Sequence, residues 1–348
     1  MSPGLTSHLT QTERRLSRGE SVIIFMKITV IGCGRWGSLI TWYLASHKGH
    51  EVTLYGRATS SHMQRFLTER RNDLLTLPES VALSTDLSVC ADPACQVIII
   101  SIGAQGLRGL MEELRAYDLQ DKMVVLCMKG IEATTGKRLT EVVGEYLDSS
   151  VKVAVWVGPG HVQEFYAGIP NCMVIDSEDE DTKRKLVREF SSDLIRFYYG
   201  TDLIGSEIGA ASKNVVGIAA GMLDGHGLTT LKGALMSRGT REIARLISAM
   251  GGSELSAYGL CHLGDYEATV FSKFSHNRAF GEAFVTGQPY AALAEGYATA
   301  KALVLLGQAY GVDLPICRAV YHILYEGADP RAELESLFER ALKTEFYL

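Results

Sequence analysis

The sequence has no excess of positive charge: among 348 residues, 34 Lys and Arg stand against 40 Asp and Glu, for a formal net charge of −6. A protein that binds nucleic acid through its phosphates needs a basic surface, so this balance argues against a nucleic-acid partner. No uncharged apolar run approaches the roughly 18 residues that a membrane helix requires, which argues against integral membrane association.

Cysteine and histidine motifs are also missing. The seven cysteines are an odd number and include no Cys-x-x-Cys pair. They predict reduced, mostly buried thiols in a cytoplasmic protein instead of disulfides or a zinc site. The nine histidines show no His-x-x-x-His or His-Glu-x-x-His spacing, so no metal is expected. A hydrolase G-x-S-x-G turn and a Walker phosphate loop are absent as well.

The first 25 residues are polar and lack the apolar segment and cleavage site of a signal peptide. We interpret residues 1–25 as a disordered extension or the result of a misassigned start codon. The strand-like stretch MKITVIG follows from Met26.

The rest of the chain shows two different sequence patterns, one after the other. Up to about Gly200, short apolar runs alternate with amphipathic segments, which predicts a largely parallel sheet covered by helices on both faces. Beyond it, Ala/Gly/Leu-rich helical patterns continue alone. The sequence thus predicts an α/β domain over 26–204 and an all-α domain over 205–348. The expected strands are 27–32, 51–56, 97–103, 123–130, 153–160, 172–177 and 195–200; the expected helices of this part include 36–48, 105–116, 137–147 and 179–192.

Gly32, Gly34 and Gly37 form a G-x-G-x-x-G motif directly after the first strand and directly before a helix. The first glycine permits a tight turn, the second lets a pyrophosphate approach the backbone, and the third lets the helix pack on the strand. The free N–H groups and the positive dipole end of that helix then face the phosphates. This context predicts a nicotinamide dinucleotide site, so we interpret 26–204 as a Rossmann-type dinucleotide-binding domain and 205–348 as the substrate-binding domain.

The choice between NAD and NADP is read about 20 residues past the glycines, at the end of the second strand. Arg57 stands there, and no Asp or Glu is present to bind a ribose 2′-hydroxyl. An arginine suits a 2′-phosphate, so NADP is expected to be accepted beside NAD. The alternative is an ordinary surface arginine.

Two lysines occupy unusual positions. Lys129 lies at the carboxyl end of an expected parallel strand, where it either meets an anionic or carbonyl substrate or reaches solvent. Lys213 is the only charged residue in the apolar stretch 208–223. Burial lowers the pKa of a lysine toward a value useful for proton transfer, although a lysine can also reach solvent from an inner helix.

A third polar segment, residues 262–281, contains Asp265, Ser275, His276, Asn277 and Arg278. The carboxylate could hold a lysine ammonium, while the serine, asparagine and arginine offer donors to a phosphate. The alternative is a solvated loop.

In chain order, GCGRWG, CMKG, GPG, SKNVVGIAAGMLDG, GLCHLGD, SHNRAFG and AEGYATAK resemble the NAD(P)-dependent glycerol-3-phosphate dehydrogenase family. The resemblance extends from Met26 to about Tyr325. It implies a helical C-terminal domain of the 6-phosphogluconate dehydrogenase type and reduction of dihydroxyacetone phosphate to sn-glycerol 3-phosphate for phospholipid synthesis.

The resemblance also implies roles for single residues. Lys213 matches the catalytic lysine, and Lys129 and Asp265 match residues that hold the substrate and orient that lysine. The implied cofactor contacts, beside the three glycines, are Arg35, Trp36, Arg57, Lys129, Val162, His276, Leu293 and Glu295. The implied substrate contacts are Lys129, Gly158, Gly160, Lys213, Asn214, Asp265, Ser275, His276 and Asn277.

The chain departs from the family pattern at three places. His276 stands where the family has an arginine that contacts cofactor and substrate phosphate, and Arg278 or Lys273 could compensate for it. Gly160 replaces a hydroxyl residue. The segment after Asp265 also differs and brings Glu267 close to the site in sequence.

These departures leave two alternatives open: a dehydrogenase of another small phosphorylated or carboxylated oxo compound, and a non-catalytic dinucleotide-binding sensor. Binding a dinucleotide alone requires none of Lys129, Lys213 and Asp265, which favours an enzyme. The apolar helices of the second domain favour a homodimer.

Overall fold

The computed structural model of the chain describes residues 25–339 and 344. The sequence-based expectation for residues 1–25 therefore lies, apart from Phe25, outside the described residues.

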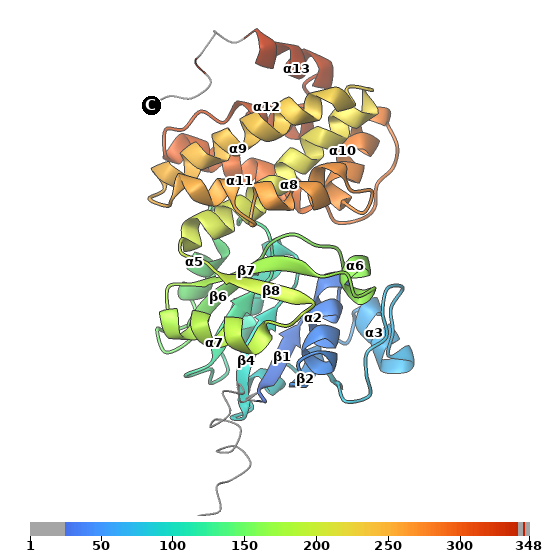
Figure 1. Ribbon diagram of the computed structural model, residues 1–348, viewed down its shortest axis with the longest axis vertical. Helices are drawn as coiled ribbons and strands as arrows, with labels where there is room; N and C mark the ends of the chain where they lie inside the picture. Colours follow the sequence, from blue (N-terminus) through green and yellow to red (C-terminus); the bar gives the residue numbers. More distant parts are fainter. Residues whose placement is uncertain (1–24, 340–343, 345–348) are drawn as a thin grey trace, which may run out of the picture.

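The N-terminal part forms one eight-stranded sheet in the order β3-β2-β1-β4-β5-β6-β7-β8 (Figure 1). All neighbouring strands are parallel except β6 and β7, which are antiparallel. The predicted largely parallel sheet is thereby confirmed. The strands are β1 (Lys27–Ile31), β2 (Glu51–Tyr55), β3 (Ala82–Ser84), β4 (Cys95–Ile100), β5 (Met123–Leu126), β6 (Lys152–Val157), β7 (Asn171–Ser177) and β8 (Ile195–Tyr199).

Both faces of this sheet are covered by helices, which explains why its strands are apolar on both sides. One face packs in a core with α2 (Arg35–Ser46), α3 (Ser61–Glu69), α6 (Val162–Tyr166) and α7 (Glu180–Phe190). The other face packs with α4 (Leu107–Leu114) and α5 (Leu139–Gly144). Strand β4 shows the alternation, because Val97 and Ile99 belong to the first core and Ile98 and Ile100 to the second.

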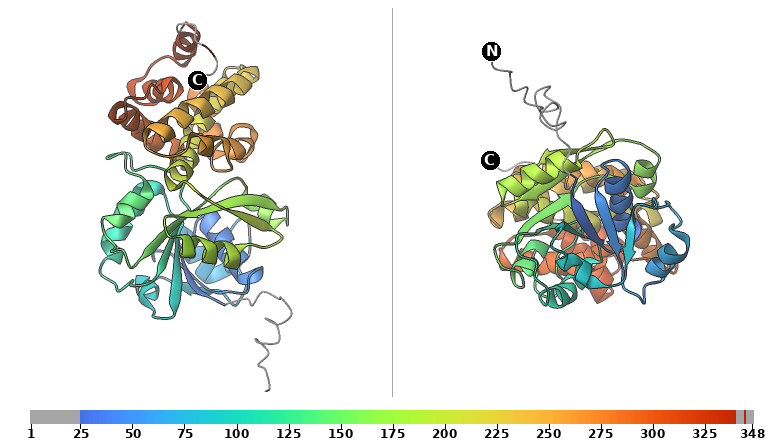
Figure 2. Two further views of the ribbon diagram at one scale, coloured as in Figure 1. Left: turned by 60° about the vertical axis from the view of Figure 1, so that its left-hand side comes forward. Right: turned by 90° about the horizontal axis from the view of Figure 1, so that it is seen from below.

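The C-terminal part is helical, as predicted, and lies beyond the carboxyl ends of the central strands (Figures 1 and 2). Its longest helix, α8, is buried along most of its length and contacts α9, α10, α11 and α12. The helices are α8 (Leu203–Gly225), α9 (Lys232–Ala249), α10 (His276–Thr286), α11 (Glu295–Ala309), α12 (Pro315–Tyr321) and α13 (Pro330–Phe338). Short helical turns η5 (Leu263–Asp265) and η6 (Glu267–Phe271) connect α9 to α10.

Glycines let α10 approach α8 closely. A Cβ added at Gly221 of α8 would lie 1.9 Å from the carbonyl oxygen of Arg278, and one added at Gly281 of α10 would lie 2.1 Å from that of Ile218. Side chains larger than hydrogen would force the two backbones apart. This close contact fixes where the first residues of α10 lie.

The two parts are joined at the segment between β8 and α8, where Asp202 caps α8 by accepting the Gly205 N–H. A buried ion pair connects them a second time, between Arg138 before α5 and Glu207 of α8, with an N–O distance of 2.8 Å. Within residues 25–339, no helix combines the length and apolarity needed to cross a bilayer.

Candidate active site

A cavity of about 750 Å³ lies between the sheet and the helical part, and residues of both line it. On the sheet side it borders the ends of β1 and β4, where the strand order reverses, which is the usual ligand position in open α/β sheets. Most of the residues predicted from the sequence line it: Gly32, Gly34, Arg35, Trp36, Arg57, Lys129, Gly160, Lys213, Asn214, Asp265, Ser275, His276, Asn277, Leu293 and Glu295.

The glycine-rich turn has the shape of a phosphate cradle. Gly32 has a φ of +114°, and a Cβ there would lie 2.1 Å from the Ser101 carbonyl oxygen. A Cβ at Gly37 would lie 1.9 Å from the Gly32 carbonyl oxygen, so Gly37 is needed for packing and does not line the cavity. A Cβ at Gly34 would meet nothing within 4 Å. The open space at Gly34, before the N-terminus of α2, fits a dinucleotide pyrophosphate.

Further groups around this turn are suited to the same cofactor. The indole Nε1 of Trp36 is buried without a hydrogen-bond partner among the described residues, and Trp36 lines the cavity. Glu295 begins α11 and accepts the Ala104 N–H at 3.0 Å, which holds it over the sheet domain. Burial raises the pKa of Glu295.

Two lysines from different domains share one carboxylate oxygen. The Nζ of Lys129, after β5, lies 2.6 Å from Oδ2 of Asp265, and the Nζ of Lys213, in α8, lies 2.9 Å from the same oxygen. Lys129 also donates to the Gly158 carbonyl at 2.5 Å. The Asp265 side chain is 1% exposed, and its Oδ1 has no hydrogen-bond partner among the described residues.

This arrangement sets the acid strength of Lys213. Burial lowers its pKa to about 8; the nearby Lys129 charge acts in the same direction, while Asp265 opposes both. A lysine with such a pKa can give and take a proton near neutral pH.

The segment after Asp265 holds one group that the sequence reasoning missed and one that it misplaced. Thr269 accepts a hydrogen bond from Lys213 Nζ at 2.6 Å and lines the cavity. Glu267, expected close to the site, is exposed and lies outside the lining. The π-helical turn η6 directs Thr269 inward, so the departure in sequence at Glu267 does not reach the site.

His161 is a second missed residue. It lines the cavity beside Gly160, and its Nε2 is buried without a hydrogen-bond partner among the described residues. Burial lowers its pKa, which favours the neutral ring. Its position directly after GPG was the available signal.

The expected phosphate-binding loop is largely occupied by internal contacts. Ser275 caps α10 by accepting the Arg278 N–H, and Asn277 donates to the Asn214 side chain and accepts the Gly296 N–H. Arg278 forms ion pairs with Asp224 and Glu282. It is therefore not the compensating cation that the sequence suggested.

His276 instead contacts the glycine-rich turn. Its Nε2 accepts a hydrogen bond from Nη1 of Arg35, 241 residues away in the chain, and its Nδ1 lies 2.7 Å from the Tyr290 hydroxyl. Lys273, the other suggested compensating residue, is exposed and does not line the cavity.

The remaining predicted residues lie at or beyond the margin. Arg57 is largely exposed and pairs with Glu113 at 2.8 Å. Leu293 is 66% exposed at the cavity rim. Gly158 and Val162 lie outside the cavity lining: the first contributes its carbonyl to Lys129, and the second is buried in the core at the first residue of α6.

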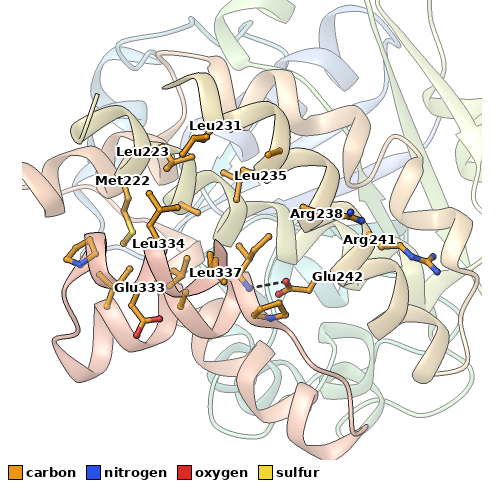
Figure 3. A pocket seen from close by; sticks show the side chains of 18 of the residues that line it. Met222, Leu223, Leu231, Leu235, Arg238, Arg241, Glu242, Glu333, Leu334 and Leu337 are labelled. Carbon is orange, nitrogen blue, oxygen red and sulfur yellow. Dashed lines mark hydrogen bonds between the residues drawn. The ribbon is translucent and has the colours of Figure 1, made fainter. Parts of the chain in front are cut away.

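A second cavity, of about 490 Å³, lies within the helical domain between α8, α9, α12 and α13 (Figure 3). Apolar side chains such as Met222, Leu235 and Leu337 form much of its wall. Glu242 accepts the N–H groups of Ile316 and Cys317 there and so satisfies the start of α12. None of the predicted site residues lines this cavity.

Comparison with known proteins agrees with this geometry. Residues 27–183 match the N-terminal profile of NAD-dependent glycerol-3-phosphate dehydrogenase, and residues 202–335 match its C-terminal profile. A glycerol-3-phosphate dehydrogenase [NAD(P)+] of Prosthecochloris aestuarii is 36% identical over 334 residues, which cover 92% of this chain and 100% of that protein. A protein of the same name from Clostridium botulinum is 32% identical over 333 residues, covering 92% and 99%.

A solved structure shows the same arrangement of domains. The crystal structure of glycerol-3-phosphate dehydrogenase from Coxiella burnetii matches with a TM-score of 0.85 at 27% identity, covering 91% of this chain and 99% of that one.

Proposed function

The chain belongs to the NAD-dependent glycerol-3-phosphate dehydrogenase family, and from this we propose that it interconverts dihydroxyacetone phosphate and sn-glycerol 3-phosphate with NAD or NADP as cofactor. The glycerol 3-phosphate feeds glycerophospholipid synthesis. The observation that carries the proposal is the buried Lys213, with a lowered pKa, in one cavity with the glycine-rich turn.

The nicotinamide supplies the hydride, and the residues of this chain supply position and proton transfer. Hydride addition to the substrate carbonyl carbon leaves negative charge on its oxygen, which requires a proton donor nearby. Lys213 is that donor, and it takes the proton back in the reverse direction. Asp265 and Thr269 hold its Nζ at 2.9 Å and 2.6 Å, so the donor is oriented before the substrate binds.

Lys129 contributes positive charge beside the same oxygen atom of Asp265. Two ammonium groups against one carboxylate leave the centre with a net positive charge. This charge attracts an anionic substrate and stabilises the oxygen that becomes negative.

The experiment that tests the reaction follows NADH and NADPH oxidation at 340 nm with dihydroxyacetone phosphate. We expect turnover by the wild-type protein and loss of at least about 100-fold in kcat for Lys213→Ala, the range of general acid catalysis. NADPH binding should stay nearly intact, because Lys213 lies on the helical side of the cavity. An equal loss of cofactor affinity and activity in Lys213→Ala would contradict a proton-transfer role.

We further propose residues 26–204 as the cofactor domain and 205–348 as the substrate domain, a division that falls in the first turn of α8. A homodimer is proposed on the aromatic side chains of α10 and α11, where Phe284 and Tyr297 remain 41% and 39% exposed. Sedimentation equilibrium tests it, and a mass of one 38.0 kDa chain would contradict it.

Six buried and one partly buried free thiols support a cytoplasmic location, because disulfides are rare in reducing compartments.

A further inference from the structure

Two lysines and two arginines line the cavity, and three of these four side chains already have a carboxylate partner. Lys129 and Lys213 share Asp265, and Arg57 pairs with Glu113. Among the described residues, Arg35 forms no ion pair, although it lines the same cavity. Within the described part of the chain, Arg35 is therefore the one of these four side chains that has no carboxylate partner.

A short chain of hydrogen bonds holds this guanidinium in place. Arginine only donates, so Nε2 of His276 must accept from Arg35 Nη1, and the proton of a neutral ring then lies on Nδ1. That Nδ1–H donates to the Tyr290 hydroxyl at 2.7 Å. Burial and the Arg35 charge both lower the pKa of His276, which agrees with a neutral ring.

The groups that the sequence suggested for phosphate recognition are mostly engaged elsewhere. The Ser275 hydroxyl oxygen caps α10, Asn277 bonds to Asn214 and Gly296, and Arg278 pairs with Asp224. A phosphate dianion bound beside α10 would still need a strong donor that carries charge. Arg35 uses one of the five guanidinium N–H groups on His276 and retains four.

We propose that Arg35 is the substrate-phosphate-binding residue of this site, with His276 and Tyr290 as the residues that position its guanidinium. The cation thus comes from the glycine-rich turn of the sheet domain, and its tip lies at residue 276 of the helical domain. This inference rests on the proposed function, since it names how that substrate is recognised.

A phosphate near Arg35 could belong to the substrate or to the pyrophosphate of the cofactor, because the residue begins α2 directly after the glycines. The contact with His276 directs the guanidinium across the cavity toward α10, which favours the substrate. Separate titrations of the two ligands distinguish these sources.

The experiment compares the wild-type protein with Arg35→Gln. NADH is titrated alone by fluorescence, and sn-glycerol 3-phosphate is then titrated by calorimetry into the NADH-saturated protein. We expect the Kd for glycerol 3-phosphate to rise about 10- to 100-fold, the scale of a charge-assisted hydrogen bond, and the Kd for NADH to change less than about threefold. Retained NADH binding also shows that the variant is folded.

Two further variants sharpen the result. In Arg35→Gln/His276→Arg the guanidinium returns from the opposite wall, so most of the glycerol 3-phosphate affinity should be recovered. Lys273→Gln removes one positive charge from the exposed loop before α10 and should change neither Kd. In turnover assays, Arg35→Gln should raise the KM for dihydroxyacetone phosphate.

The proposals fail in different ways. If wild-type protein shows no turnover of dihydroxyacetone phosphate, the proposed reaction is wrong. If wild-type protein and Arg35→Gln bind glycerol 3-phosphate equally, or if the variant loses NADH affinity by the larger factor, the role of Arg35 is wrong.

Discussion

At the scale of single residues, the carboxylate of Asp265 is the centre of the proposed proton-transfer site, because it is shared by Lys129 and Lys213. Each neighbour changes the proton affinity of Lys213 in a known direction. The Asp265 charge raises the pKa of Lys213, while the Lys129 charge and burial lower it. Substitution of one neighbour or the other can therefore raise or lower the pKa of Lys213.

In the proposed reaction, reduction requires protonated Lys213, so its rate should fall as the pH rises through about 8. Oxidation requires the neutral amine, so its rate should rise over the same range. Lys129→Met removes a like charge, which should raise the pKa of Lys213 and shift the pH at which these rates change to a higher value. Asp265→Asn removes an opposite charge and should shift that pH to a lower value. Profiles of kcat/KM against pH, measured for reduction and for oxidation, detect these shifts. If the pH dependence is the same in both variants as in the wild type, it belongs to a group other than Lys213.

How far such residue roles can be predicted from the sequence depends on what each one needs. Lys213 is visible because it is a single charge in an apolar helix, and the glycines are visible because their spacing is local. The contact of Arg35 with His276 joins residues 241 positions apart, so no local pattern indicates it. Thr269 is concealed for another reason: its direction depends on the π-helical turn.

At the scale of helices and strands, glycines determine how closely α8 and α10 pack. Gly281→Ala would place a methyl group 2.1 Å from the Ile218 carbonyl oxygen, on backbone that cannot move independently. We expect a loss of about 1–3 kcal/mol in stability, the usual cost of overpacking, and a raised KM because the α10 N-terminus shifts. Urea unfolding and steady-state kinetics measure both effects.

The matched control is Gly233→Ala in α9, an exposed position where an added Cβ meets nothing within 4 Å. There alanine should stabilise the helix by about 0.5–1 kcal/mol. Equal responses at Gly233 and Gly281 would show that helix propensity, and not close packing, determines the outcome.

The same scale shows where sequence-based prediction of the fold succeeds and where it does not. The long apolar runs of β1, β4 and β6 are buried on both faces and are evident in the sequence. Strand β3 has three residues, all at least partly exposed, and was missed because its pattern is too short. The strand expected over 123–130 ends at Leu126 in β5, so Lys129 lies in the loop that follows. The apolar run in the sequence continues past this point and does not show where the strand ends.

At the scale of the whole molecule, the two domains are tied together by buried polar contacts. The Arg138–Glu207 pair is 12% and 5% exposed at its side chains, and Glu207 also accepts from the Thr140 N–H and hydroxyl. Burial raises the pKa of Glu207 in spite of the arginine. Removing either side chain should therefore destabilise the protein, because the remaining charge would be buried without a partner of opposite sign.

Glu207→Ala should lower the stability by about 3–5 kcal/mol, since it leaves Arg138 uncompensated. The double variant Arg138→Met/Glu207→Leu should recover much of that loss. Asp73→Ala, which breaks the exposed pair with Arg65, should change the unfolding midpoint little. If the unfolding midpoint of Glu207→Ala is as close to that of the wild type as the midpoint of Asp73→Ala, the Arg138–Glu207 pair does not stabilise the contact between the domains.

The shared carboxylate has one more consequence when the domains are considered as moving parts. Lys129 reaches Asp265 from the sheet domain, whereas Lys213 and Asp265 both belong to the helical domain. Opening the cleft would return Lys213 to water and remove the like charge of Lys129, and both changes raise its pKa. In an open molecule Lys213 would thus stay protonated at neutral pH, and in the proposed function its charge would attract the anionic substrate. Closure around that anion would lower the pKa of the same side chain to about 8 and so make it a stronger acid.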